Sequence, residues 1–184
     1  MKIPLETELQ LLKAIRGGER EAKRRLYERF AGRTMAVALR YVANQEDARD
    51  VVQDSFVKIL TSLDHFNYQG EGSLKAWVTS IVVHQAVDYV KRHERLQTTD
   101  ILPDEPEEEE PDIGRVPPDV LWRLISQLPP GYRMVLNLYV FEQLPHKEIA
   151  RLLGIAPGTS TSQYARAKKE LAKRINNYLK NNKL

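Results

Sequence analysis

The residues best placed to do chemistry lie between 146 and 169, and the chemistry they suit is hydrogen bonding to DNA. This segment reads HKEIARLLGIAPGTSTSQYARAKK. Gly154 favours the left-handed backbone that ends a helix, and Pro157 suits the first turn of the next helix. A short helix, a tight turn and a longer basic helix are typical of a helix-turn-helix motif, whose second helix enters the major groove.

Side chains of this motif are predicted to contact bases and phosphates. Gln163 can pair with adenine, and Arg166 with guanine or a phosphate, because each presents two hydrogen-bonding groups side by side. The lysines suit phosphates, which position a protein without specifying a sequence. An amphipathic helix pair inside a plain bundle is the alternative. The predicted contacts with duplex DNA are Lys147, Thr159, Thr161, Ser162, Gln163, Arg166, Lys168 and Lys169.

Two residues depart from the usual motif. Ala156 lacks the side-chain acceptor that commonly caps a helix. Ser160 stands where an apolar residue is expected. We therefore expect a first turn of the second helix that is less rigid than usual.

A second candidate surface combines aromatic and basic residues between 65 and 95. Phe66 and Tyr68 lie in a polar loop, and the helix predicted after it ends in the basic run KRHER at 91–95. Aromatic rings stack on unpaired bases, and basic side chains bind the adjoining backbone. The alternative is structural: aromatic residues such as Trp77 pack in the core, and the basic run complements the helix dipole.

A third candidate surface is acidic. Asp47, Asp50 and Asp54 recur at helical spacing, with Gln53 beside them. Charged faces of this kind are usually solvated surfaces. The hypothesis that this face binds a partner therefore needs support from other parts of the sequence.

Catalytic and metal-binding patterns are absent from the sequence. The chain has no cysteine, and its four histidines lack metal-ligand spacing. Gly70 and Gly72 are followed by Lys75 where a dinucleotide-binding loop has its third glycine, and no P-loop or nucleophile elbow occurs. We therefore expect no enzyme activity, no catalytic residue, no metal and no cofactor.

These surfaces need helices to position them, and the hydrophobic spacing predicts an all-α protein. In the first half, helices are expected over about 7–16 and 19–43, then after Asn44 and from Ser73, with these two residues as caps. Leu60 is placed on the buried side of the third helix. In the second half, helices are expected over about 118–127, 131–141, 146–153 and 157–179.

Charge divides the chain into two small helical domains joined by a linker. Residues 96–116 hold eight acidic residues and one arginine with little apolar content, so we expect a flexible acidic linker. The domains are then 1–95 and 117–184, and the second carries eleven basic residues against four acidic ones. No apolar run is long enough to span a membrane, and the N-terminus lacks the apolar core of a signal peptide. We expect a cytoplasmic protein.

In sequence order, these segments resemble those of bacterial extracytoplasmic-function (ECF) sigma factors of the sigma-70 family. The stretch DARDVVQDSF from Asp47 resembles the part of region 2 that binds RNA polymerase. Residues 66–77 and the helix after them resemble the part that opens and reads the minus-ten element. The stretch LPPGYRMVLNLY from Leu128 resembles the start of region 4, and the helix-turn-helix resembles its reader of the minus-thirty-five element.

The resemblance implies a four-helix sigma region 2 domain, a helix-turn-helix sigma region 4 domain and a role in transcription initiation, in a stress or envelope response. It implies that core RNA polymerase binds Asp47, Asp50, Gln53 and Asp54. It assigns recognition and melting of the minus-ten element to Phe66, Asn67, Tyr68, Ser73, His84, Lys91 and Arg92.

The implied partners are core RNA polymerase and promoter DNA, and an anti-sigma factor holds many relatives. We expect a monomer when free, with no membrane insertion. His84, Thr161 and Gln163 differ from the residues that relatives often carry at these places. The promoter sequence of a relative is therefore not transferred to this chain.

Two other functions fit parts of the sequence. A stand-alone helix-turn-helix regulator would bind duplex DNA without polymerase, but it would leave the aromatic loop and the acidic face without a role. A nucleic-acid-processing enzyme would use the motif only for docking, yet the sequence offers it no candidate catalytic site.

Overall fold

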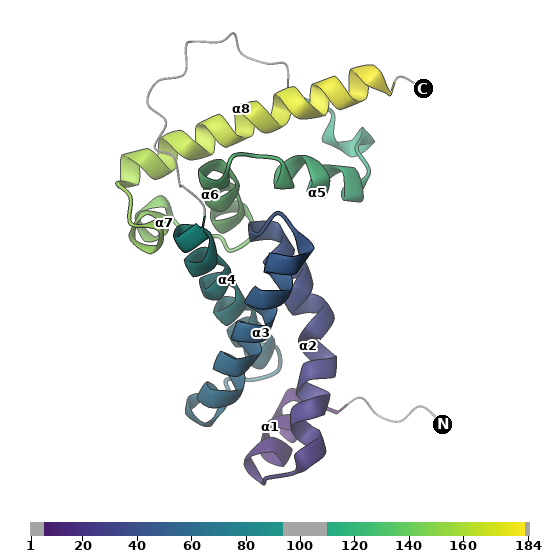
Figure 1. Cartoon of the computed structure of the whole chain (residues 1–184), viewed down its shortest axis with the longest axis vertical. Coiled ribbons are helices and arrows are strands. Elements are labelled where there is room, and N and C mark those ends of the chain that lie inside the picture. The colour runs from purple at the N-terminus through teal and green to yellow at the C-terminus, as the bar shows by residue number, and fades with distance from the viewer. Residues whose placement is uncertain (1–5, 94–109, 183–184) are drawn as a thin grey trace. The chain divides into compact units, whose positions relative to one another are not determined.

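A computed structural model describes residues 6–93 and 110–182. Within these ranges the regular structure is helical, with no strand, which confirms the all-α prediction (Figure 1). The described residues divide into two compact units, one of 6–39 and 44–86 and the other of 40–43, 87–93 and 110–182. No helix in the described part of the chain is long and apolar enough to cross a membrane.

The N-terminal unit is built from α1 (Glu8–Arg16), all but the last two residues of α2 (Arg20–Tyr41), α3 (Gln45–Ser62) and α4 (Ser73–His93) up to residue 86, with the 3-10 turn η1 (Leu63–His65) after α3. A capping box starts α1, because Thr7 and Gln10 each accept the other's backbone N–H. Asn44 caps α3 by accepting the N–H of Asp47 at 2.8 Å, as predicted. Buried apolar side chains from these elements form the core, including Leu11, Leu12, Leu26, Ile59, Leu63 and Leu74.

The buried side of α3 differs from the predicted one at Leu60. Val52, Phe56 and Ile59 are buried, whereas Leu60 and Val57 are exposed. With 3.6 residues per turn, Leu60 lies about 100° around the helix from Ile59, outside the stripe that meets the core. The apolar residues of α3 therefore continue past the core onto the surface.

The C-terminal unit is built mainly from α5 (Pro118–Ser126), α6 (Pro130–Val140), α7 (His146–Leu153) and α8 (Pro157–Asn181). The long helix α8 contacts each of the other three (Figure 1). Two apolar clusters join α8 to α5 and α6. One consists of Ile125, Leu128, Tyr132, Leu136 and Ala167, and the other of Val116, Val120, Leu124 and Ile175.

The last residues of the predicted linker are folded. Ile113–Arg115 form the 3-10 turn η2, and Val116 is buried in a cluster with Val120 and Ile175. This apolar anchor places 113–116 with the C-terminal unit, a few residues before the predicted domain start at 117. Residues 94–109, which hold most of the predicted flexible linker, lie outside the described residues.

The turn between α7 and α8 has the predicted geometry. Gly154 has a φ of 71°, and its N–H donates to the carbonyl of Ala150. Pro157 is the first residue of α8, and Ala156 gives it no side-chain cap. Ser160 is fully buried, with its Oγ 2.9 Å from Nδ1 of His146. A hydroxyl fits this position because it meets a polar partner there.

We predict that Gly154→Ala lowers the free energy of unfolding of the C-terminal unit by about 1–2 kcal/mol, because an L side chain is strained in the left-handed region. Gly158→Ala is the control, since a methyl group added to Gly158 of α8 would meet no atom within 4 Å and the residue has no positive φ. Replacing glycine by alanine in a helix leaves stability unchanged or raises it by about 0.5–1 kcal/mol.

Urea unfolding of the full chain measures this effect. The chain has two tryptophans, Trp77 and Trp122, so a Trp77→Phe background leaves Trp122 fluorescence as a report on the C-terminal unit alone. Equal unfolding midpoints for the two alanine variants would contradict the prediction.

Candidate nucleic-acid interface

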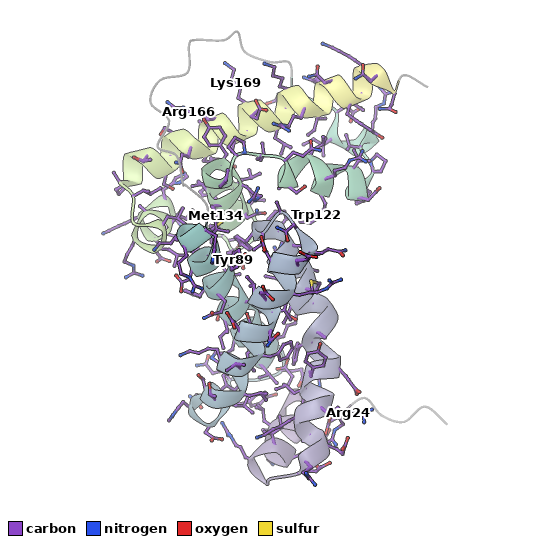
Figure 2. The ribbon with its side chains drawn as sticks, viewed as in Figure 1. Arg24, Tyr89, Trp122, Met134, Arg166 and Lys169 are labelled. Carbon is purple, nitrogen blue, oxygen red and sulfur yellow. The ribbon has the colours of Figure 1, made fainter. Side chains whose placement is uncertain are left out.

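The first turns of α8 present a polar, basic face to solvent. Thr161, Ser162 and Lys168 are exposed on this helix, and Lys147 is exposed on α7. Thr159, Arg166 and Lys169 are half-buried, and Figure 2 labels the last two along α8. Because positions 161, 162, 168 and 169 repeat at helical spacing, Thr161, Ser162, Lys168 and Lys169 share one side of the helix. Seven of the eight predicted duplex contacts therefore remain accessible.

Gln163 is the exception, because the structure buries the side chain that was predicted to read a base. Its side chain is only 3% exposed. A methyl group added to Gly131 on α6 would lie 3.1 Å from Nε2 of Gln163, so the amide packs directly against that helix. Position 163 falls on the same inward side as Ser160 and Ala167, which are also buried.

An aromatic cluster supports the start of both motif helices. The His146 ring stacks on Tyr139 with centroids 4.7 Å apart, and Tyr139 contacts Tyr164 at 4.4 Å. Lys168 lies 5.0 Å from the centroid of the Tyr164 ring. Burial, and then the neighbouring Tyr139, raise the pKa of Tyr164. These contacts join α6, α7 and α8 at the base of the predicted DNA-binding face.

The end of the acidic segment lies against α8. A groove of about 690 Å³ is lined by Glu110 and Ile113 on one side and by Lys168, Lys169 and Ile175 on α8. Two predicted phosphate contacts therefore share a groove with an acidic residue of their own chain.

In the loop of residues 66–72 of the N-terminal unit, a second predicted contact is buried. Phe66 is only 8% exposed, and its ring packs on Trp77 with centroids 4.8 Å apart. It is a core residue and offers no free face to a base. Asn67 is exposed, and Tyr68 and Ser73 are half-buried. On α4, His84, Lys91 and Arg92 are exposed.

Ser73 does not cap α4 as predicted. Its Oγ accepts the N–H of Gln69 at 3.2 Å and donates to the carbonyl of Gly70 at 2.6 Å, so it closes the loop upon itself. The N–H groups at the start of α4 are accepted instead by the carboxylate of Glu8 on α1. Sequence reasoning missed Glu8, because no local pattern links it to a helix more than sixty residues away.

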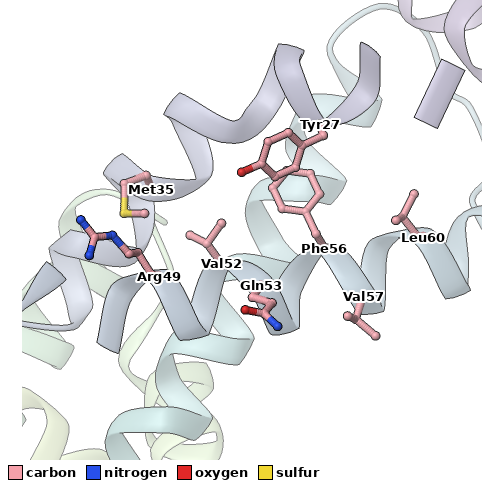
Figure 3. Close-up of a pocket in the computed structure, with 8 residues that line it drawn as sticks. All are labelled: Tyr27, Met35, Arg49, Val52, Gln53, Phe56, Val57 and Leu60. Carbon is pink, nitrogen blue, oxygen red and sulfur yellow. The ribbon is translucent and has the colours of Figure 1, made fainter. Parts of the chain in front are cut away.

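The predicted acidic face of α3 lies beside an apolar groove. Asp50, Gln53 and Asp54 are exposed and Asp47 is half-buried next to the Asn44 cap. The groove, of about 390 Å³, runs between α2 and α3 (Figure 3) and is lined by Tyr27, Met35, Arg49, Val52, Gln53, Phe56, Val57 and Leu60. Tyr27 packs on Phe56 with centroids 4.7 Å apart. The sequence pattern predicted the acidic residues of this surface but not the exposed Tyr27 and Val57 beside them.

Within residues 6–93 and 110–182, no group of three or more histidine or acidic side chains is arranged to hold a metal ion. The chemistry that these surfaces offer is hydrogen bonding, ion pairing and apolar contact.

Comparisons with known proteins identify both units. The sigma-70 region 2 family matches residues 26–96, and the sigma-70 region 4 family matches residues 119–171. The RNA polymerase sigma-H factor of Pseudomonas aeruginosa is 24% identical over 184 residues, covering 92% of this chain and 94% of that protein. The ECF RNA polymerase sigma-E factor of Haemophilus influenzae is 26% identical over 185 residues, covering 92% and 95%.

The ECF RNA polymerase sigma factor SigE of Mycolicibacterium smegmatis is 29% identical over 154 residues, which is 79% of this chain and 58% of that longer protein. The chain therefore belongs to the sigma-70 family of RNA polymerase sigma factors, in its extracytoplasmic-function group.

Two solved structures are also similar. CnrH, in complex with the cytosolic domain of CnrY, is 22% identical with a TM-score of 0.48, covering 91% of this chain and 96% of that one. The sigma factor RpoE, in complex with the anti-sigma factor NepR from Bartonella quintana, is 22% identical with a TM-score of 0.49, covering 83% and 96%. The family assignment rests on the two region matches and the curated relatives.

The different burial of Gln163 and Ser162 makes these neighbours a matched pair for mutation. We expect Gln163→Ala to lower the free energy of unfolding by about 1 kcal/mol, the usual cost of truncating a packed side chain, without changing base preference. We expect Ser162→Ala to change stability by less than about 0.5 kcal/mol and to alter upstream-element binding. Trp122 fluorescence in urea gives the stability, and transcription from a promoter library with a randomised upstream element gives the preference. A changed base preference in Gln163→Ala at unchanged stability would restore the base-reading role.

Proposed function

We propose that this chain recruits core RNA polymerase to promoters through three surfaces. The first turns of α8 hold the minus-thirty-five element as duplex, the loop 66–72 and the exposed face of α4 bind the opened minus-ten element, and α3 with its groove binds polymerase. The chain itself makes and breaks no covalent bond. The main support for this proposal is that a region 2 match is followed along the chain by a region 4 match, as in the family. Each matched region has an exposed surface suited to its partner.

The upstream contact uses the polar and basic side of α8. Thr161 and Ser162 at its start suit hydrogen bonds to base edges, and Arg166 suits guanine or a phosphate. Lys147, Lys168 and Lys169 neutralise phosphates, which adds affinity that falls with salt. The burial of Gln163 leaves recognition to fewer and shorter side chains, so we expect modest base discrimination from this helix.

The minus-ten contact relies on polar groups rather than on Phe66. Asn67 is exposed and can pair with a base edge, and Tyr68 beside it retains part of its surface. Extruding a base costs a few kcal/mol, and stacking on an aromatic side chain returns roughly 1–3 kcal/mol. One captured base therefore roughly offsets one unstacking, and polymerase contacts must supply the rest of strand separation.

The polymerase contact combines charge with apolar area. The exposed acids Asp50 and Asp54 flank a groove whose rim includes Tyr27 and Val57. Specific protein interfaces pair an apolar centre with a polar rim, and charges there steer association more than they add affinity. The groove gives this surface the apolar centre that the acidic residues alone lack.

Run-off transcription with purified bacterial core polymerase on fragmented genomic DNA tests the function. We expect discrete transcripts that depend on the added chain, and their start sites define both promoter elements. Binding to duplex DNA without any such transcript would favour a stand-alone regulator instead. A stress or envelope role, an anti-sigma partner and a monomeric free state stay predictions of the family resemblance.

We predict that Val57→Ser weakens binding to core polymerase by about tenfold, because Val57 is 58% exposed on the groove rim and burying such a side chain contributes about 1.5 kcal/mol. Leu9→Ser is the control, since Leu9 on α1 is another exposed apolar residue, 38% exposed, and does not line the groove. Fluorescence anisotropy of the labelled chain titrated with core polymerase gives both affinities. Equal affinities for the two variants would remove the groove from the interface.

A further inference from the structure

We propose that Glu8 is a positioning residue for the loop 66–72, fixing this loop for capture of an unpaired promoter base. The inference rests on the proposed function of the loop. It assigns a role to α1, which lies outside the predicted contacts and before the region 2 match begins at residue 26.

The carboxylate of Glu8 is buried at the point where the loop becomes α4. It is only 2% exposed. Its Oε2 accepts the backbone N–H groups of Gly72 at 2.9 Å and Leu74 at 3.0 Å, and its Oε1 accepts that of Lys75 at 3.1 Å. The first N–H groups of a helix have no partner within the helix, and a negative charge is favoured there. Glu8 therefore acts as a helix cap supplied from another part of the chain.

A second carboxylate makes the reverse connection. Glu71, in the loop, accepts the backbone N–H of Glu8 at 3.3 Å, so the loop also holds the first turn of α1. The same carboxylate accepts from Arg29 of α2 at 3.4 Å and from the hydroxyl of Tyr68 at 3.4 Å. Glu8 of α1 thus binds the start of α4, and Glu71 of the loop before α4 binds the start of α1. Tyr68 belongs to the same hydrogen-bond network.

The other end of the loop is also held from α1. The guanidinium of Arg16 donates to the carbonyl of Phe66 and, at 3.5 Å, to that of Leu63. The Phe66 ring is anchored on Trp77. Between the two anchors, Asn67 and Gln69 are exposed. One helix therefore holds both ends of the segment that presents polar groups to solvent.

The backbone of the loop makes these anchors necessary. Gly70 and Gly72 have φ values of 114° and 93°, and a methyl group added to either would meet no atom within 4 Å. Glycine reaches many backbone conformations at similar energy, so the two glycines alone do not select one. Binding groups must be held within about 0.5 Å of their productive positions by the residues behind them. The Glu8 carboxylate supplies this restraint at Gly72, two residues after Gly70.

The test compares base discrimination in Glu8→Gln and Glu6→Gln holoenzymes. Glutamine keeps the size of Glu8 but loses the charge and turns one acceptor into a donor facing N–H groups. Glu6 is the matched control, because its carboxylate pairs with Arg25 of α2 at 3.1 Å rather than with backbone N–H groups of the loop. The probe is a fluorescent single-stranded oligonucleotide carrying the non-template minus-ten sequence of a promoter mapped by run-off transcription, with versions substituted at each base.

We expect Glu8→Gln to weaken binding of the cognate oligonucleotide by about tenfold. We also expect loss of discrimination at the captured base, so that the dissociation constant of the oligonucleotide substituted there, divided by that of the cognate one, moves towards one. Polymerase affinity should stay within about twofold, and Glu6→Gln should keep the ratio of the unsubstituted chain. A loss of folded protein alone lowers binding of all oligonucleotides equally and leaves the ratio unchanged. An unchanged ratio in Glu8→Gln would therefore overturn the proposal.

If Glu8→Gln fails to assemble with polymerase, Arg16→Lys tests the other anchor by the same ratio, because lysine keeps the charge but cannot reproduce the fork of the guanidinium. A reduced ratio in Arg16→Lys supports positioning from α1, and an unchanged ratio refutes it. The unsubstituted chain must first give promoter-specific transcripts. Their absence would refute the proposed function before any variant is examined, so the two failures are distinguishable.

Discussion

The start of α4 depends on one buried carboxylate from another helix. Glu8 accepts hydrogen bonds from three backbone N–H groups, so these groups at the helix start are paired without water. Leu74 can therefore be buried in the core beside them. A buried charge is costly unless it is paired by good hydrogen bonds, and here the partners are fixed backbone groups. The same contact joins the first turn of α1 to the end of the loop 66–72 and to the first turn of α4.

The C-terminal unit solves a related problem with one long helix. α8 contributes Ala167 and Ile175 to the two apolar clusters and must also present residues to DNA. These two tasks divide the circumference of the helix, so each position in its first turns belongs to one side or the other. Ser160 and Gln163 fall on the inner side and are buried with polar neighbours, whereas Thr161 and Ser162 fall on the outer side. A polar residue at the start of a recognition helix is therefore not evidence of a DNA contact by itself.

The sequence alone predicts the helices, the helix-turn-helix and the family, because each leaves a local mark. Helical spacing, the cap at Asn44 and the positive φ of Gly154 are decided within a few residues. The side chains of Phe66, Gln163, Leu60 and Ser73 lie in other surroundings than predicted, and these differences have a shared cause. Residue type indicates what a side chain can do, but its direction depends on which neighbouring helix packs against it. The Glu8 contact could not be predicted, since its partners are brought together only by tertiary structure.

The two units also place their polar anchors in comparable positions. In each, a side chain at the first residue of a short helix contacts the start of the longer helix that bears the proposed nucleic-acid contacts: Glu8 of α1 binds the first turn of α4, and His146 of α7 meets Ser160 of α8. A helix start is a useful point to restrain. Its first N–H groups have no partner within the helix, so a side chain from elsewhere can bind there without breaking internal hydrogen bonds. Restraint there fixes where the adjoining loop or turn delivers its exposed residues. In each unit a short helix, α1 or α7, therefore restrains the start of a longer helix, α4 or α8.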